Sequence, residues 1–475
     1  MTPAIRLSAG LEHAALTILG ALMLFAPIPL GSKHPLGWGI LTTLILVAAT
    51  LWIASTVTAS TTRSLNYPSR IASGLFFLFS AYIFAQALPL PASIVAFLNP
   101  GAHALYSAVE PGEPIAMALS TDRGVTLDEA LRSSSLFFVF LMLVNLLNTK
   151  RRLIVFTYVV LACGIAHASF ALLDAVYDGH LFRRPIIGLG SPSASIAGTY
   201  SNRNHFAGLM ELTFFVAVAL YLAQLRRSKP LRNTRERLRR VSNWLLSVQP
   251  WYLLSLLIAL VALLFSASRG GFLSAAAASL LLGVFLAFRS RFQVSKANLL
   301  IVLAVVLPLF AATALGVDRL AKRLENRGLT DDRYELRQLG YRMASDFPFF
   351  GSGSGTFRHL YPAYENTPFG NGKLLHHVHN DYLELALETG LVGFALFSSA
   401  ILLCLYWLVK APFRITDRTI AAIRFGGLGG VLSLLIHSLV DWNLQIPANA
   451  YWFTVVLAIA MASTNIDHDR RISRR

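Results

Sequence analysis

Residues 376–384 read His-His-Val-His-Asn-Asp-Tyr-Leu-Glu, and they gather three imidazoles, an amide and two carboxylates directly before an apolar run. Imidazole is the side chain whose unperturbed pKa lies nearest neutrality, so His377 or His379 can take a proton from an attacking hydroxyl. Asn380, or one of the two carboxylates that follow it, would fix the tautomer of the imidazole. The segment therefore predicts general-base catalysis, with His377 and His379 as catalytic residues and Asn380 in contact with substrate.

A metal site is the competing interpretation of three clustered histidines. The chain has no HExxH, no CxxC and no run of aspartates that would supply further ligands. Its two cysteines, Cys163 and Cys404, fall in separate apolar runs. We therefore expect a metal-independent site that uses no cofactor.

Arginines at the ends of apolar runs form a second group of candidates. Arg203 stands beside Asn204 in TYSNRNHFAG, and Arg269 stands in FSASRGGFLS before two glycines that would allow close approach. An arginine at membrane depth is costly unless it reaches water or an anion, and a carboxylate or headgroup phosphate is a sufficient partner for any one of them. Several arginines around one cavity favour a diphosphate, because a guanidinium binds phosphate oxygens in pairs. We expect Arg203 and Arg269 to hold the diphosphate, and we expect Asn204, Arg333 and Arg337 to bind substrate.

The composition places these residues in a membrane protein. Of the side chains, 55% are hydrophobic and 14% are charged, which is too apolar for a soluble protein. A bilayer core about 30 Å thick is crossed by about 20 apolar residues. We therefore predict an all-α integral membrane protein, a single domain over residues 1–475, with about 12 transmembrane helices. The expected spans are 12–30, 36–57, 71–90, 131–148, 153–175, 205–225, 251–267, 271–288, 298–316, 386–408, 420–439 and 450–465.

The basic residues outside these spans fall mostly on one side of the predicted membrane, which places both termini in the cytoplasm. The net charge of +17 is thus a signal of topology; membrane lipids are expected partners and nucleic acid is not. The segment 317–385 between the ninth and tenth spans then lies on the opposite, periplasmic side, and we expect it to carry short helices and part of the active site. One such helix is expected at residues 331–345.

The segment HVHNDYLELALETGLVGF resembles the signature of the O-antigen ligase and O-antigen polymerase superfamily, and YSNRNHFAG, SASRGG and DRYELRQLGYRMASDFPFFGSGSGTF occur in that family's order. The resemblance implies a GT-C-like glycosyltransferase, independent of metal, at the periplasmic face of the bacterial inner membrane. It also implies an undecaprenyl-diphosphate-linked oligosaccharide as donor. By position, His379 matches the family's catalytic histidine, and Arg203 and Arg269 match diphosphate-binding arginines. Arg333 matches the arginine that opens the long-loop helix. His377 takes the first position of an HxHN variant, and which histidine is the base stays open.

The sequence leaves the acceptor open. A ligase transfers the glycan to lipid A–core, a polymerase to another lipid-linked glycan, and a protein glycosyltransferase to Ser or Thr. Acidic residues in the outward segment 91–130 would repel an anionic core and lean toward a polymerase. A transporter of a small anion or a glycan is the alternative class, although the inverted repeat that is common in transporters is not detected.

Overall fold

The computed structural model describes most of the chain, in the residue ranges 2–59, 65–109, 116–177, 179, 181, 196–224, 233–288, 332–364, 376–410 and 417–472. The predicted span 298–316 and much of the predicted outer loop lie outside the described residues. The described chain is almost entirely helical. It contains one short sheet, in which β1 (Leu90–Pro91) pairs antiparallel with β2 (Ala116–Met117).

Nine helices of the described part are long and apolar enough to cross a bilayer. They are α1 (Pro3–Phe25), α2 (Pro35–Ala59), α3 (Tyr67–Gln86), α7 (Lys150–Val176), α9 (Arg203–Gln224), α12 (Arg269–Phe288), α17 (Asp381–Lys410), α18 (Arg418–His437) and α19 (Pro447–Ile472). Two more helices occupy predicted spans: α6 (Arg123–Leu146), which begins with polar turns, and α11 (Gln249–Phe265), which is shorter. The all-α membrane fold is confirmed, and the number of about twelve spans stays a prediction.

Local sequence signals explain where several helices begin. The Thr2 side chain caps α1 by accepting a hydrogen bond from the backbone N–H of Ile5 at 3.5 Å, and a proline occupies the first turn. Short polar side chains cap other helices in the same manner, namely Asn66 for α3, Asp122 for α6, Thr149 for α7 and Asp417 for α18. Each cap satisfies a backbone donor that the helix itself leaves unpaired.

The centre of the bundle is built from α9, α18 and α19, whose residues are nearly all buried. Glycines of α18 allow this close packing. A Cβ at Gly426 would lie 2.3 Å from the Ala219 Cβ of α9, and one at Gly427 would lie 2.6 Å from the Ala460 Cβ of α19. Small residues at such contacts are typical of membrane helices, which gain their stability from close backbone approach.

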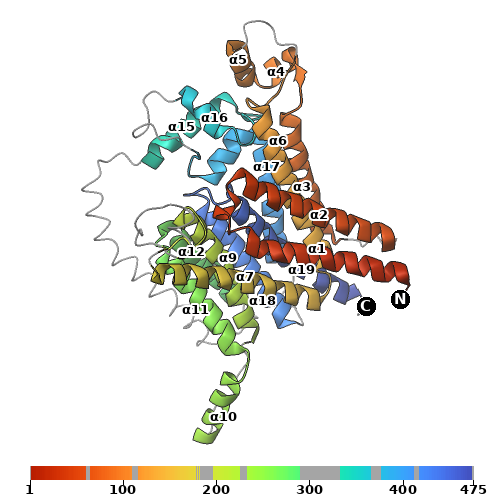
Figure 1. Ribbon diagram of the computed structural model, residues 1–475, viewed down its shortest axis with the longest axis vertical. Helices are drawn as coiled ribbons and strands as arrows, with labels where there is room; N and C mark the ends of the chain where they lie inside the picture. Colours follow the sequence, from red (N-terminus) through yellow and green to blue (C-terminus); the bar gives the residue numbers. More distant parts are fainter. Residues whose placement is uncertain are drawn as a thin grey trace, which may run out of the picture.

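The bundle has two different ends (Figure 1). Helix α10 (Thr234–Leu245) projects at the lower end. At the upper end lie α4 (Ala92–Leu98), α5 (Pro100–Val109), α15 (Asp332–Asp346) and α16 (Phe357–Leu360), which is followed by η2 (Tyr361–Tyr364). The helix that the sequence predicts at 331–345 is therefore confirmed as α15.

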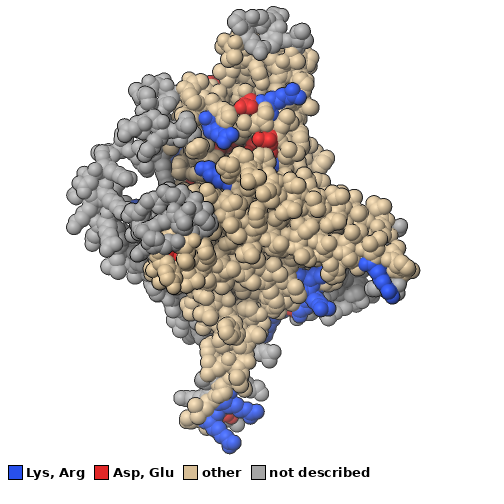
Figure 2. All heavy atoms as spheres, in the orientation of Figure 1, with Lys and Arg blue, Asp and Glu red and all other residues tan. Residues whose placement is uncertain are grey.

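The elements of the upper end share a hydrophobic core of their own. Its buried members include Val95 of α4, Leu339 of α15, Phe357 of α16 and Val378 of the histidine segment. Between the two ends the surface is largely free of charge on the face shown, and basic side chains gather over α10, whose basic residues are all arginines (Figure 2). This distribution fits the predicted sidedness, in which α10 lies in the cytoplasm and the upper end outside it.

A break in α17 fastens the upper end to the bundle. Gly390 has φ 60° and ψ −170°, angles that do not occur in a helix, so the helix is interrupted there. The loop of residues 348–356 crosses α17 at this interruption. The loop pairs with it through the backbone: Leu391 N–H donates to the Pro348 carbonyl at 2.9 Å, and Gly353 N–H donates to the Glu388 carbonyl at 2.9 Å. A Cβ on Gly390 would lie 2.4 Å from the carbonyl carbon of Phe349, so glycine is required.

Candidate active site

The HVHN segment, residues 377–380, directly precedes α17 at the upper end of the bundle. The Asn380 side chain begins the helix, because its Oδ1 accepts hydrogen bonds from the backbone N–H groups of Tyr382 and Leu383, both at 3.0 Å. Its Nδ2 donates to the Leu439 carbonyl at 3.1 Å, just beyond the end of α18. Asn380 thus ties α17 to the segment between α18 and α19, and its role as a substrate contact stays a prediction.

His377 is held rigidly on two sides. Its Nδ1 lies 2.6 Å from Glu384 Oε1, while the other oxygen of Glu384 accepts a hydrogen bond from Val378 N–H at 2.9 Å. Its ring stacks on the indole of Trp442, with ring centroids 3.8 Å apart. Of the groups that the sequence offers for fixing a tautomer, Glu384 is therefore the one that contacts His377.

His379 faces a carboxylate from a distant part of the chain. Its backbone has φ 60°, a conformation that residues other than glycine rarely adopt and that often marks functional sites. Its Nδ1 lies 3.8 Å from Asp441 Oδ1, longer than a hydrogen bond, and the side chain is 26% exposed whereas that of Asp441 is 1% exposed. His379 is thus open to a substrate on one side and faces a buried charge on the other.

Asp441 lies between α18 and α19 and is anchored by the residues around it. Its Oδ2 accepts a hydrogen bond from the Asn204 amide, and its Oδ1 accepts one from Trp442 N–H at 2.9 Å. His205 Nε2 lies 3.7 Å from Oδ1. Asn204, a predicted substrate contact, therefore touches the carboxylate that faces His379.

The electrostatics of the site favour an ionised Asp441 and a neutral His377. Burial alone would raise the pKa of Asp441, but polar contacts with His205 and His379 outweigh it and hold that pKa well below its usual range. Burial, together with the repulsion that a protonated His377 would meet from neighbours such as Lys33 and Arg358, lowers the pKa of His377 well below its ordinary value. A fixed negative charge therefore lies beside His379 at neutral pH.

The two arginines at span ends lie at this same end of the bundle. Arg203 is the first residue of α9 and Arg269 the first of α12, and both side chains are exposed. Helices α9 and α12 pack against each other, and Asn204, next to Arg203, reaches Asp441. The amino-terminal ends of α9, α12 and α17 all point to this region and carry partial positive charge, which favours an anion.

The glycines beside Arg269 serve the packing of α12. A Cβ at Gly270 would lie 2.8 Å from His437 Nε2, and one at Gly271 would lie 2.9 Å from Glu211 Oε1. Glu211 Oε1 lies 2.7 Å from His437 Nδ1, within a buried pair that links α9 and α18. The glycines do allow a close approach, but the groups that approach them are side chains of α9 and α18. This packing fixes the start of α12, where Arg269 stands.

The predicted arginines of the outer loop are placed by α15. This helix packs closely against residues 376–380, as Gly340 shows: a Cβ at that position would lie only 3.0 Å from Val378 Cγ1. Arg337 is half-buried on α15. Arg333 belongs to its first turn, and the position of its side chain lies outside the described residues. The expected role of Arg333 and Arg337 in binding substrate stays a prediction.

Four residues of the site, Asp441, His205, Trp442 and Lys33, are not among the catalytic and substrate-binding residues that the sequence predicts. Trp442 is the surface on which His377 stacks, and His205 meets its edge with ring centroids 4.3 Å apart. Lys33, from the turn between α1 and α2, places its Nζ 4.8 Å from the centre of the same indole. In the sequence, only its place directly after Asp441 could have pointed to Trp442 as a site residue. No feature of the sequence around Lys33 could have pointed to that residue. Within the described residues, no three His, Cys, Asp or Glu side chains are arranged to hold a metal ion.

Comparisons with known proteins agree with the resemblance in the sequence. Residues 254–398 match the family described as O-antigen ligase. The matched region contains Arg269, α15 and the HVHN segment, whereas Arg203 and Asp441 lie outside it. No curated protein matched the chain. The match spans about a third of the chain and supports what the HVHN motif indicated, a multi-pass membrane protein of the O-antigen ligase/polymerase superfamily.

Proposed function

We propose that the protein is an inverting glycosyltransferase that moves a glycan from undecaprenyl diphosphate to an acceptor hydroxyl, independently of metal. The observation that carries the proposal is the meeting of an oriented histidine pair, a buried carboxylate and two arginine-bearing helix starts at one end of the bundle. His379 and Asp441 supply base chemistry. Arg203 and Arg269 stand at amino-terminal helix ends, where an anion is favoured.

In the proposed reaction His379 is the base. The imidazole takes the proton of the acceptor hydroxyl, the oxygen attacks the anomeric carbon, and the bond to the diphosphate breaks on the opposite face with inversion. The imidazolium that forms is stabilised by the Asp441 carboxylate at 3.8 Å. General-base assistance of this kind is worth about 10²- to 10⁴-fold in rate.

The leaving diphosphate is bound by Arg203 and Arg269, which stay charged at any relevant pH. The positive ends of α9 and α12 add to the field at the place where negative charge develops. Arg333 and Arg337 on α15 would contact the donor from the other side of the histidine segment. Because α10 and its arginines lie at the opposite end of the bundle, this arrangement supports a site at the periplasmic face of the inner membrane with both termini in the cytoplasm.

A reconstituted assay tests the base. Purified protein is supplied with a lipid-diphosphate-linked oligosaccharide, in EDTA, with either a second lipid-linked glycan or lipid A–core as acceptor. We expect product with wild type and a loss of about 10²-fold or more in His379→Ala. His377→Ala separates the two histidines: a larger loss in His377→Ala than in His379→Ala would assign the base to His377. Full activity in both variants would overturn the proposal, and the acceptor that yields product distinguishes a polymerase from a ligase.

The arginine roles need a different readout. Replacing Arg203 or Arg269 by Lys keeps the charge and removes the paired hydrogen bonds, so we expect the donor KM to rise about tenfold or more. Arg239→Lys, an exposed change on α10, is the matched control and should leave KM unchanged. Unaltered donor KM in both site variants would exclude these arginines as diphosphate ligands.

A further inference from the structure

Helix α10 presents an apolar face that nothing in the described structure covers. Leu238 and Leu245 lie seven residues apart, and two helical turns bring them to the same face. They are 65% and 60% exposed, so this face does not pack on the bundle. Leu246, which follows the helix directly, is 88% exposed. The three leucines thus form an apolar strip at the lower end of the bundle, where a helix surrounded by water would carry polar residues.

The rest of α10 is strongly basic. Its 12 residues include four arginines and one glutamate, a net charge of +3, and basic side chains gather over it (Figure 2). Arg235 and Arg239 are exposed, and their spacing of four residues places them together on one flank of the leucine face. Arginines at the edge of an apolar face reach lipid headgroups while the leucines enter the acyl region. This pattern is typical of helices that lie in the plane of a membrane surface.

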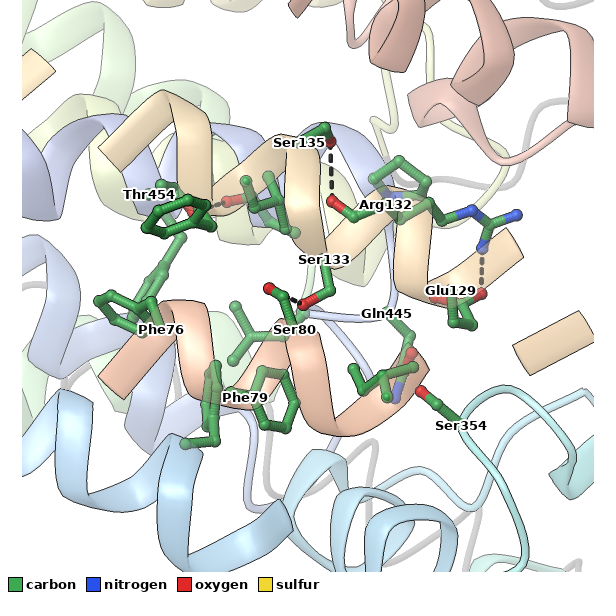
Figure 3. A pocket seen from close by; sticks show the side chains of 18 of the residues that line it. Phe76, Phe79, Ser80, Glu129, Arg132, Ser133, Ser135, Ser354, Gln445 and Thr454 are labelled. Atoms are coloured by element: carbon green, nitrogen blue, oxygen red, sulfur yellow. Dashed lines mark hydrogen bonds and ion pairs between the residues drawn. The ribbon is translucent and has the colours of Figure 1, made fainter. Parts of the chain in front are cut away.

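The charges of Arg235 and Arg239 are available to an anionic partner. Within the part of the chain that the structure describes, neither arginine takes part in an ion pair. An arginine among the spans behaves differently: Arg132 lines a buried cavity and is paired with Glu129 (Figure 3). The arginines of α10 are therefore not held by the protein itself, and phosphate oxygens are suitable acceptors for them.

The chain holds α10 at the boundary of the bilayer. Only residues 246–248 separate it from α11, which occupies a predicted span, and such a stretch reaches about 10 Å at most. The turn is hydrogen-bonded, because Ser247 N–H donates to the Trp244 carbonyl at 3.0 Å and Gln249 N–H donates to Ser247 Oγ at 3.2 Å. The Gln249 side chain donates to the Gln224 carbonyl, at the end of α9, at 2.8 Å. In the view of Figure 1, α10 runs across the direction of α1 and α7, which fits a helix that lies along the membrane surface.

We propose that α10 lies in the plane of the cytoplasmic leaflet and binds anionic phospholipid, with its leucines among the acyl chains and Arg235 and Arg239 on the headgroup phosphates. The leucines alone would accept any lipid, so the arginines supply the selectivity for anionic lipid. Trp251, 69% exposed in the first turn of α11, marks the same interface, where indole rings are enriched. This surface lies at the end of the bundle opposite His379, and its binding of lipid does not depend on the proposed transfer reaction.

The position of α10 is measured with full-length protein in nanodiscs that hold one copy each, which excludes a second copy as the partner. Cys163→Ala and Cys404→Ala remove the native thiols. An NBD fluorophore is attached through Leu245→Cys on the apolar face or, as the matched control, through the exposed Asn243→Cys on the other side of the helix. In discs that contain phosphatidylglycerol, lipids with brominated acyl chains should quench the probe at 245 strongly and the probe at 243 weakly. Equal quenching at the two positions would overturn the proposal.

The selectivity for anionic lipid is tested with the probe at 245. Each arginine near an anionic surface contributes about fivefold in affinity, so Arg235→Gln with Arg239→Gln should lower the ratio of embedded to free helix about 30-fold at low salt. Arg6→Gln with Arg151→Gln is the matched control, because it removes the same charge from exposed positions at the starts of α1 and α7, and the ratio should stay that of the unsubstituted protein. An equal loss in the control, or equal quenching in discs of phosphatidylcholine alone, would overturn the proposal. The unfolding midpoint of each variant checks that it is folded.

Discussion

Replacing Asp441 by Asn removes the negative charge that faces His379 and leaves the size of the side chain unchanged. The two groups lie 3.8 Å apart, and Asp441 is buried. At an effective dielectric constant of about 20 the attraction between this carboxylate and an imidazolium is about 4 kcal/mol. His379 is 26% exposed, so solvent reduces the value, and we take about 2–4 kcal/mol as the stabilisation lost in the transition state.

That range corresponds to a decrease in kcat of about 30- to 1000-fold. The donor KM should change little, because the arginines at the starts of α9 and α12 are untouched. Asn also leaves one donor without its acceptor, since Asp441 accepts from both the Asn204 amide and Trp442 N–H. We therefore expect a modest loss of thermal stability as well, and it is measured separately by thermal unfolding of the purified variant.

The assay is transfer from lipid-diphosphate-linked oligosaccharide at saturating donor, with Asp417→Asn as control. Asp417 caps the other end of α18 and pairs with Lys150 on α7, so its replacement removes an acid of the same kind far from His379. Asn caps a helix as well as Asp does, and activity should stay near that of wild type. If Asp441→Asn is folded and its kcat lies within about threefold of wild type, the argument that Asp441 stabilises the charged base is refuted.

Other features of the structure give three further predictions. Topology predicts that in right-side-out vesicles a membrane-impermeant maleimide labels Tyr341→Cys on α15 and spares Arg235→Cys on α10; the reverse pattern would place the site in the cytoplasm. Gly390→Ala brings a Cβ within 2.4 Å of the crossing loop and should destabilise the protein by about 2 kcal/mol or more, whereas Gly283→Ala, with nothing within 4 Å, should not, as unfolding midpoints will show. The pKa of His377 is lowered in the folded chain, whereas in the unfolded chain it is about 6.5, so the folded chain binds a proton at His377 less readily. The stability that neutral His377 contributes is therefore complete above about pH 6.5 and is lost as the pH falls. Stability should therefore decrease more steeply from pH 6.5 to 5 in wild type than in His377→Gln, and equal slopes would contradict the assignment of a neutral His377.

The sequence alone determined the helices and their approximate positions. Apolar runs of bilayer length, polar caps such as Asn66 and Thr149, and the proline-rich turn after α1 are local signals, because helix formation depends on residues within a few positions. The helix at 332–346 was predictable for the same reason. The HVHN motif and its neighbours also sufficed to indicate the family that the match over residues 254–398 supports.

Only the tertiary structure decided which groups meet. His379 and Asp441 are separated by α17 and α18, and Asn204 reaches Asp441 from α9, so these contacts depend on how the helices pack. The sequence offered several partners for the histidines with nothing to rank them, and packing chose Glu384 for His377. In the same way the glycines after Arg269 look in sequence like room for a ligand, and the packed bundle fills that room with His437 and Glu211. Helix formation is decided by near neighbours along the chain, whereas a site is decided by side chains that become neighbours only when the helices are packed together.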